Sequence, residues 1–424
     1  MGIELISLLT LVVAIFIGFK RGVNTGLVSI AFAFLLGFFV YEPLASNPDT
    51  MVALSSAPAK AATLIKGWPS SLFFMLLGMT LLFSIARANR TLELLARKAA
   101  YLSNGNKKLL PIIFFILATV LAAVGPGNIA VCALVLPIAM AVAHEEKISP
   151  LLMAGVTIAG SNAGGLSPIA PTGIIAVNLA SAIGYDVGTH VFIQMVIAQV
   201  IIAAVLYIGL GGYKLKKDAD AKAVKPAKFN THQMMTIAVI GAVVLSIVFA
   251  KWNIGFAAFV GSFVLLFMKV ADEKQSIAGI PWSTLILVCG VGVLVNVIKI
   301  AGGIDLLTDT LSVFMNQQTS GAIITIIAGL MSSVSSASGV VMPTLIPTVP
   351  GLVENLGIDG KTLITAVVLG SHFVTNSPIS TLGALAMASA DEEIDKTKFF
   401  NQLMILGFGG VVFGAILVFV GIVG

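Results

Sequence analysis

Two long apolar segments of the chain are interrupted at matching positions by the same small residues. Residues 160–173 read GSNAGGLSPIAPTG, and residues 370–383, 210 positions later, read GSHFVTNSPISTLG. Proline removes a backbone donor and glycine weakens a helix, so each copy is predicted to break a helix at membrane depth. Backbone freed there must be buried in protein or line a polar cavity. Paired breaks of this kind point to the binding site of a transporter.

The composition supports this interpretation. The chain is 58% hydrophobic and 10% charged, with a mean hydropathy of +1.05, which is far from the range of soluble domains. The basic residues flank apolar segments and form no patch interleaved with aromatic residues, so nucleic acid is not an expected partner. Residues 3–19 lack a basic leader and a small-residue cleavage site, and they are predicted to be a first membrane helix.

The apolar runs predict an all-α polytopic membrane protein with ten crossings, two of them broken. The predicted crossings cover residues 3–19, 25–41, 70–87, 151–182 (broken), 189–212, 233–250, 254–270, 283–301, 360–390 (broken) and 399–423.

Two further apolar runs, 109–143 and 319–353, are too long for one crossing and carry small residues midway. The interruptions are GPGN at residues 125–128 and SSASG at residues 335–339. Each run is either a pair of full helices or a re-entrant hairpin whose tip stops inside the membrane. The distribution of positive charge decides between these alternatives.

The chain reads as two repeats. At an offset of 210, Pro137 matches Pro347, and at an offset of 212, Pro69 matches Pro281. Two amphipathic segments at corresponding places, about 90–103 and 304–316, are predicted to lie along the membrane surface. The predicted parts are a scaffold (1–108) and a transport part (109–212) of the first repeat, a basic linker (213–231), and a scaffold (232–318) and a transport part (319–424) of the second.

Re-entrant hairpins leave five crossings in each repeat, and an odd number inverts the second repeat relative to the first. Nineteen of the 24 lysines and arginines then fall on one side, and the other side receives Lys60, Lys66, Lys251, Lys299 and Lys361. This asymmetry favours the re-entrant alternative and predicts a plasma-membrane protein with a cytoplasmic linker and both termini outside.

Two hairpin tips and two helix breaks, related by an inverted repeat, can bind an anion and a cation together. Helix N-termini attract anions, while free carbonyls and hydroxyls coordinate sodium. We expect the anion near Asn128, Ser338, Thr172 and Thr381, with N–H groups aimed at it by the helices that follow Pro168 and Pro378. We expect co-transported sodium at two sites, one formed by Gly125, Asn128, Ser161, Asn162 and Gly165, the other by Ser335, Ser338, Ser371, Asn376 and Ser377.

His372 is the ionisable residue within the two interruptions, and three roles are open to it. It hydrogen-bonds the unwound backbone, contacts a substrate carboxylate, or accepts a coupling proton.

These motifs resemble those of the divalent-anion:sodium symporters of the ion transporter superfamily. Residues 127–137 are similar to the family's first hairpin, and residues 164–172 to its broken helix. Residues 3–39 look like the amino-terminal region of the MatC-type malonate and dicarboxylate carriers. The resemblance implies sodium-coupled uptake of a small dicarboxylate such as malonate, a homodimer, and elevator movement of a transport domain against a scaffold.

The chain departs from the family pattern at both tips. The Ser-Asn-Thr tip of the family is here Gly127-Asn128-Ile129, and its partner is Ala337-Ser338-Gly339. Two hydroxyls are therefore missing from the first tip and an asparagine from the second, which argues against simple transfer of a succinate or citrate specificity.

Four rival functions were weighed. A cation/proton antiporter needs a carboxylate within the membrane, and no Asp or Glu lies deep in a predicted span. Another anion carrier of the same superfamily is a further alternative, and a channel would not require paired broken helices. An intramembrane serine protease using Ser336 or Ser338 with His372 is a remote alternative, since a two-fold repeat does not fit one catalytic dyad. We therefore expect a carrier and no enzyme.

Overall fold

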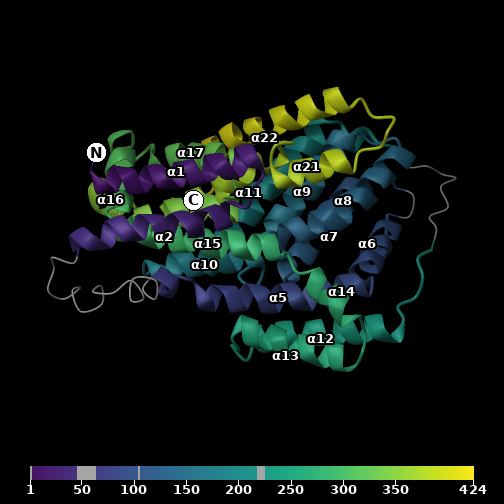
Figure 1. Cartoon of the computed structure of the whole chain (residues 1–424). Helices are drawn as coiled ribbons and strands as arrows, with labels where there is room; N and C mark the ends of the chain where they lie inside the picture. The colour runs from purple at the N-terminus through teal and green to yellow at the C-terminus, as the bar shows by residue number, and fades with distance from the viewer. Residues whose placement is uncertain (1, 45–63, 104–105, 217–224) are drawn as a thin grey trace.

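The computed structural model describes residues 2–44, 64–103, 106–216 and 225–424, and its elements within these ranges are all helices (Figure 1). Lys60 and residues 217–224 of the predicted linker lie outside the described residues. No Asp, Glu, Lys or Arg among the described residues is buried, so the interior is built from apolar and neutral polar side chains.

Seven helices of the described chain are individually long and apolar enough to cross a membrane. They are α1 (Ile3–Arg21), α5 (Ser70–Ala88), α8 (Gly127–Glu145), α11 (Gly188–Gly209), α12 (Thr231–Val248), α15 (Trp282–Ile300) and α22 (Lys396–Phe419). The protein is therefore a multi-pass membrane protein.

The other predicted crossings are two single helices and two interrupted segments. α2 (Thr25–Leu44) and α13 (Ile254–Phe267) occupy two of them, although α13 is only 14 residues long. The predicted broken segments are α9 (Pro150–Gly165) with α10 (Pro171–Ala182), and α20 (Gly360–Phe373) with α21 (Thr381–Ala388). Both segments therefore break within the predicted interruptions.

Each predicted hairpin consists of two limbs that meet at its small residues. The first is α7 (Leu109–Val124) followed by α8, and the second is α17 (Ser320–Val334) followed by residues 337–356. The second hairpin bends by 118° at its break. Its return limb is irregular and consists of a π-helical turn (Ala337–Val341), α18 (Met342–Leu345), a 3-10 turn and α19 (Val349–Leu356). How deeply either hairpin enters the membrane stays a prediction.

Among the first three long helices of each predicted repeat, helices of one repeat pack against helices of the other. α2 packs along α15, and α13 packs along α5. Glycines allow the close approach, because a Cβ on Gly78 would stand 2.7 Å from the Gly255 carbonyl oxygen, and a Cβ on Gly290 would stand against the Gly26 backbone. Small residues at helix crossings are the usual means of tight packing in membranes. Figure 1 shows α12 and α13 at one edge of the molecule and α22 at the opposite edge.

The hairpins and the broken helices pack together in the same way in both halves. α7 lies along α9, and α17 lies along α20. A Cβ on Gly160 would collide with the carbonyl oxygen of Phe115, and a Cβ on Gly370 would collide with that of Thr325. Both pairs are separated by the same 210 residues, so the identical glycines of the motif make the same contact twice.

The two amphipathic segments form α6 (Thr91–Tyr101) and α16 (Gly303–Val313). α6 packs against α5, α7 and α8 through buried Leu92 and Ala96, while the Arg97–Glu93 ion pair stays exposed. α16 packs against α1 and α19 through buried Ile304 and Leu311. A short helix, α14 (Glu273–Ala278), was not expected from the sequence, because its six residues carry no apolar periodicity that distinguishes them from a loop.

Candidate functional site

The first hairpin reverses direction at two glycines, whose backbone conformations other residues rarely adopt. α7 ends at Val124, Gly125 has a φ of +151°, and Gly127 begins α8 with a φ of +77°. A Cβ on Gly125 would collide with the Phe83 ring of α5, and a Cβ on Gly127 would stand 3.0 Å from Cδ of Pro171 on α10. The tip is therefore held between α5 and α10, the second half of the first broken helix.

Asn128 follows directly at the start of α8, and its buried amide is hydrogen-bonded through both Nδ2 and Oδ1. Its Nδ2 donates to Oδ1 of Asn162 at 3.1 Å, and its Oδ1 accepts from the Thr172 hydroxyl at 3.3 Å. The backbone N–H of Ile129 also donates to Oδ1 at 3.0 Å. Gly165 permits this approach, because a Cβ there would lie 2.9 Å from Cβ of Asn128. One side chain thus links the tip to both halves of the first broken helix.

Asn162 carries the connection on to the second broken helix. Its Nδ2 donates to the Thr375 hydroxyl at 2.7 Å and lies 3.4 Å from the His372 carbonyl oxygen. The Thr375 hydroxyl in turn donates to that carbonyl at 2.8 Å. Asn128, Asn162 and Thr375 therefore form one buried chain of neutral hydrogen bonds between the two predicted repeats.

The two breaks have the same local structure. The N–H of Ala170 donates to the Ser167 carbonyl at 2.9 Å, and the N–H of Ser380 donates to the Ser377 carbonyl at 2.9 Å. Extended residues, Ala170 and Ser380, then precede α10 and α21. Each break is a tight turn from which a new helix starts, and the N–H groups of a first turn lack partners within their own helix. In α10 the first position is Pro171, which contributes no N–H.

The predicted substrate residues of the two halves do not have equal environments. Thr172 is buried and bonded to Asn128, whereas Thr381 is exposed at the start of α21. Pro168 and Pro378 are both half-buried within their turns. The structure therefore joins Asn128 and Thr172 by a hydrogen bond, whereas among the described residues Thr381 makes no hydrogen bond to either.

The second tip is organised by a serine cap. Ser336 Oγ accepts from the N–H of Gly339 at 3.0 Å, and the π-helical turn follows. Ser338 lies buried in that turn, and a Cβ on Gly339 would stand 2.7 Å from Leu287 on α15. The second tip thus contacts α15 much as the first contacts α5. The π-helical turn also packs against α10 and α20.

The hydroxyls of both predicted sodium sites are bonded mainly to neighbouring backbone or sulfur. Ser161 donates to the Ile158 carbonyl and lies 2.9 Å from Sγ of Cys132. The hydroxyls of Ser335 and Ser371 donate to the carbonyls of Met331 and Val368, and that of Ser377 lies 3.3 Å from Sδ of Met404. The predicted sodium ligands all lie within the described residues. Of these ligands, only Asn128 and Asn162 are hydrogen-bonded to each other through their side chains.

Asn376 is an exception among these side chains. Its Oδ1 is buried and has no hydrogen-bond partner in the described part of the chain. A buried amide oxygen without a partner is costly, and it can coordinate a cation or accept a hydrogen bond from a ligand.

His372 lies buried in the last turn of α20, and its ring is bound to its own helix. Nδ1 lies 2.7 Å from the Val368 carbonyl oxygen and 3.1 Å from the Ser371 hydroxyl. Of the three roles considered for His372, the structure displays the backbone hydrogen bond, made to regular helix rather than to unwound chain.

Two residues of the site were not singled out from the sequence. Thr375 corresponds to Gly165 at the 210-residue offset, and a hydroxyl directly before the Asn376-Ser377-Pro378 break was the available signal. The other residue is Cys132, whose thiol the structure places 2.9 Å from the Ser161 hydroxyl. Its polar contact was not visible in the sequence because it depends on how α8 rotates against α9.

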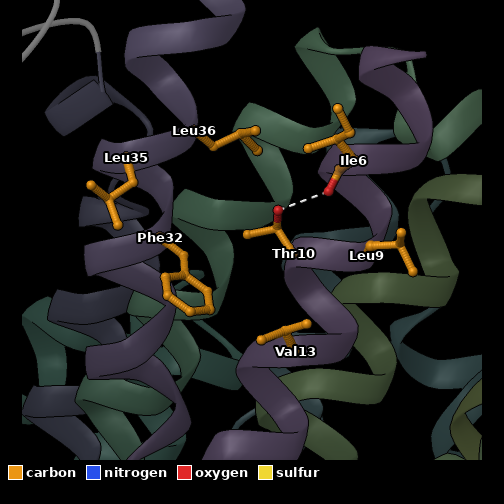
Figure 2. Close-up of a pocket in the computed structure, with 7 residues that line it drawn as sticks. All are labelled: Ile6, Leu9, Thr10, Val13, Phe32, Leu35 and Leu36. Carbon is orange, nitrogen blue, oxygen red and sulfur yellow. Dashed lines mark hydrogen bonds between the residues drawn. The ribbon is translucent and has the colours of Figure 1, made fainter. Parts of the chain in front are cut away.

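Two other polar or hollow features were compared with this site. A cavity of about 460 Å³ between α1 and α2 is lined by six apolar side chains and Thr10, whose hydroxyl already donates to the Ile6 carbonyl (Figure 2). Such a cavity offers nothing to an anion. His144, at the end of α8, lies 3.9 Å from both Asp391 and Glu393. These side chains are accessible to solvent, and they do not form a buried site. The buried network around Asn128 therefore remains the candidate site.

Comparison with known proteins agrees with a transporter fold. Residues 1–165 match the family model described as the dicarboxylate carrier protein MatC N-terminus. No protein of curated function matches the chain. Among solved structures, the YdaH transporter of Alcanivorax borkumensis, whose crystal structure is described as revealing an unusual topology, is similar. It has a TM-score of 0.56 and 13% sequence identity, covering 92% of this chain and 98% of that chain. The predicted all-helical polytopic fold is confirmed, and the resemblance of residues 3–39 to the MatC-type carriers is confirmed by a family match that covers residues 1–165.

Proposed function

Because residues 1–165 match the N-terminal family of the MatC dicarboxylate carriers, we propose that this protein is a secondary active transporter for a small dicarboxylate. We propose further that uptake is coupled to sodium and that malonate is the first substrate to test. The family match supports a dicarboxylate, and malonate rests on the sequence resemblance of residues 3–39 to the malonate carriers. The residues of the site support only the wider class of small dianions.

The observation that carries the proposal is the buried chain of hydrogen bonds from Asn128 through Asn162 to Thr375. It joins a hairpin tip to both broken helices with neutral groups alone. Asparagine amides and hydroxyls can turn from one another to a carboxylate at little cost, since they are already desolvated and positioned. A dianion at the tip would accept from Nδ2 of Asn128 and from the Thr172 hydroxyl, which now bond within the protein.

The charge of the substrate has no fixed counterpart in the site. The four arginines are Arg21, Arg87, Arg90 and Arg97, and each lies at or beyond the end of a membrane helix. We therefore assign the neutralising charge to helix N-termini and to sodium that binds with the substrate. Sodium suits the neutral oxygens present, among them the unpaired Oδ1 of Asn376. This dependence of one ligand on the other couples the two fluxes.

Movement of the substrate is assigned to an elevator mechanism. Both tips rest on the third long helix of a half, the first on α5 through Gly125 and the second on α15 through Gly339. If residues 109–212 and 319–424 move as one unit, these two contacts lie on the sliding surface. The remaining ranges, about 1–87 and 232–301, would form the scaffold and the contact of a homodimer, with α6 and α16 as the connecting arms.

The orientation is also part of the proposal. The lysine distribution supports a cytoplasmic linker and outside termini in the plasma membrane. Labelling of single cysteines at Lys228 and at Lys251 with an impermeant reagent, applied to intact cells and to opened cells, tests it. Lys251 should react in intact cells, and Lys228 only after opening.

The function is tested by uptake of labelled malonate, succinate and citrate into proteoliposomes at fixed pH. We expect saturable uptake of at least one dicarboxylate under an inward sodium gradient, and little when choline or potassium replaces sodium. Liposomes without protein and the Asn178→Ala protein serve as controls, because Asn178 bonds only to the Ile174 carbonyl on its own helix. Uptake that ignores sodium but follows a proton gradient would refute sodium coupling, and no saturable dicarboxylate uptake would refute the function.

A further inference from the structure

A basic cavity of about 610 Å³ lies where α7 begins and α11 ends, away from the candidate site. Its described lining residues are Asn106, Lys108, Tyr213, Lys214, Leu215 and Lys216. Three of these six described residues are lysines, and none of the six is acidic. The amines of all three lysines belong to exposed side chains.

The fold holds the two walls of this cavity together. α11 ends at Gly209, and Gly211 turns the chain with a φ of +73° into a 3-10 turn, Gly212–Lys214. The Tyr207 hydroxyl donates to the Lys108 carbonyl at 3.3 Å, and Gly212 packs against the Tyr207 ring. The segment after α11 is thereby fixed beside the start of α7.

The electrostatics of the cavity favour a compact anion. Lys108 immediately precedes α7, whose helix dipole adds positive potential at the same place. The neighbouring Lys107 is instead engaged with Glu146 at 3.1 Å. The amine of Lys214 lies 5.5 Å from the Tyr213 ring centroid, so a cation–π contact helps to position this amine in the cavity. Three lysines and a helix N-terminus are the chemistry that recognises a phosphate group.

The surface next to the cavity is apolar and faces outward. Ile112, Ile116 and Val120 are 40%, 52% and 53% exposed, and their spacing of four places them on one face of α7. Ile208 on α11 is also exposed beside the basic end. A polar cavity at the end of an apolar membrane-facing stripe fits an amphiphile, whereas a free anion would gain nothing from the stripe.

We propose that this cavity binds the phosphate headgroup of an anionic phospholipid, whose acyl chain lies along the exposed face of α7. Basic pockets at the ends of membrane helices bind such headgroups. The site does not depend on the proposed function, since it requires only the membrane setting. α7 begins at this cavity and ends at the tip at Gly125, so a lipid bound here would contact the helix that leads to the candidate site.

The test measures lipid binding to the full chain in detergent by native mass spectrometry, with phosphatidylglycerol and phosphatidylcholine titrated separately. The Lys108→Gln, Lys214→Gln, Lys216→Gln triple variant should bind phosphatidylglycerol about a hundredfold more weakly, since each surface lysine contributes about fivefold. The matched control, Lys274→Gln, Lys396→Gln, Lys398→Gln, removes the same charge from exposed positions elsewhere and should bind like the wild type.

Two further arms separate the possible outcomes. Inorganic phosphate and malonate at millimolar concentration should not displace the lipid, and full displacement by either would overturn the lipid assignment in favour of a free anion. If the Gln variant does not fold, the wild type still decides, because its phosphatidylglycerol affinity should fall with salt and exceed that for phosphatidylcholine. Equal, salt-independent binding of both lipids, or unchanged binding by a folded Gln variant, would overturn the proposal.

Discussion

Asn162 on α9 donates from Nδ2 to the Thr375 hydroxyl at 2.7 Å, across 213 residues of sequence. This bond and the 3.4 Å contact of the same Nδ2 with the His372 carbonyl link the two broken helices where each is about to stop. Both partners are buried, and both also contact the His372 carbonyl, so removing either side chain takes one member out of a shared network. The two halves of the site are therefore predicted to respond to mutation as a unit.

We expect Asn162→Ala and Thr375→Val to show non-additive effects on stability. The coupling energy in a double-mutant cycle should be about 0.6–1.7 kcal/mol, the range of hydrogen bonds between membrane helices. Thermal or chemical unfolding in detergent measures it. Thr157→Val is the matched control, because Thr157 is equally buried on α9 but bonds only to the Met153 carbonyl one turn back. Additive effects of Asn162→Ala and Thr375→Val would contradict the link.

The glycines of the repeated motif are predicted to act as spacers. Gly160→Ala and Gly370→Ala should each destabilise the protein by about 1–3 kcal/mol, because the new methyl group meets a backbone carbonyl that cannot move aside. Gly241→Ala on α12 is the control, since nothing lies within 4 Å of its Cβ position. A fluorescence-based unfolding assay suffices, and equal midpoints for all three variants would show that the close packing is dispensable.

The elevator proposal predicts that one crosslink stops transport and another does not. In a background with Cys132 and Cys289 changed to Ala, a disulfide between Leu287→Cys and Gly339→Cys should block uptake until it is reduced. A Cβ on Gly339 lies 2.7 Å from Cγ of Leu287, so the pair is close enough to bridge.

The control crosslink lies within the predicted transport unit. A disulfide between Gly329→Cys on α17 and Val411→Cys on α22 should leave uptake unchanged, since both helices would move together. Uptake that survives the first crosslink, or is lost with the second, would show that the boundary between scaffold and transport unit is misplaced.

Much of this fold could be predicted because hydropathy and helix breakers act locally. The ends of α1, α5 and α15 follow the limits of apolar runs, and the breaks fall at Ser167-Pro168 and Ser377-Pro378. The turns there repeat because identical residues at equal spacing impose equal backbone geometry. The short α14 and the irregular return limb of the second hairpin lacked such signals.

The direction of individual side chains could not be predicted in the same way. Asn162 and Ser161 are adjacent in the same motif, yet one reaches Thr375 and the other Cys132. Which neighbour each finds depends on the rotation of α9 against α8 and η4 (Val374–Asn376), and that rotation is set by packing across the whole molecule. The exposure of Thr381 beside the burial of Thr172 has the same origin.

The central claim is that a dicarboxylate binds at the first tip through Asn128, and equilibrium binding tests it most directly. Titration of malonate and succinate into purified protein with sodium present, followed calorimetrically, gives the dissociation constant. Loss of one hydrogen bond to a charged ligand predicts about ten- to a hundredfold weaker binding by Asn128→Ala, while Asn178→Ala binds like the wild type. If Asn128→Ala and Ser338→Ala both bind with wild-type affinity, the dicarboxylate does not bind at the tips.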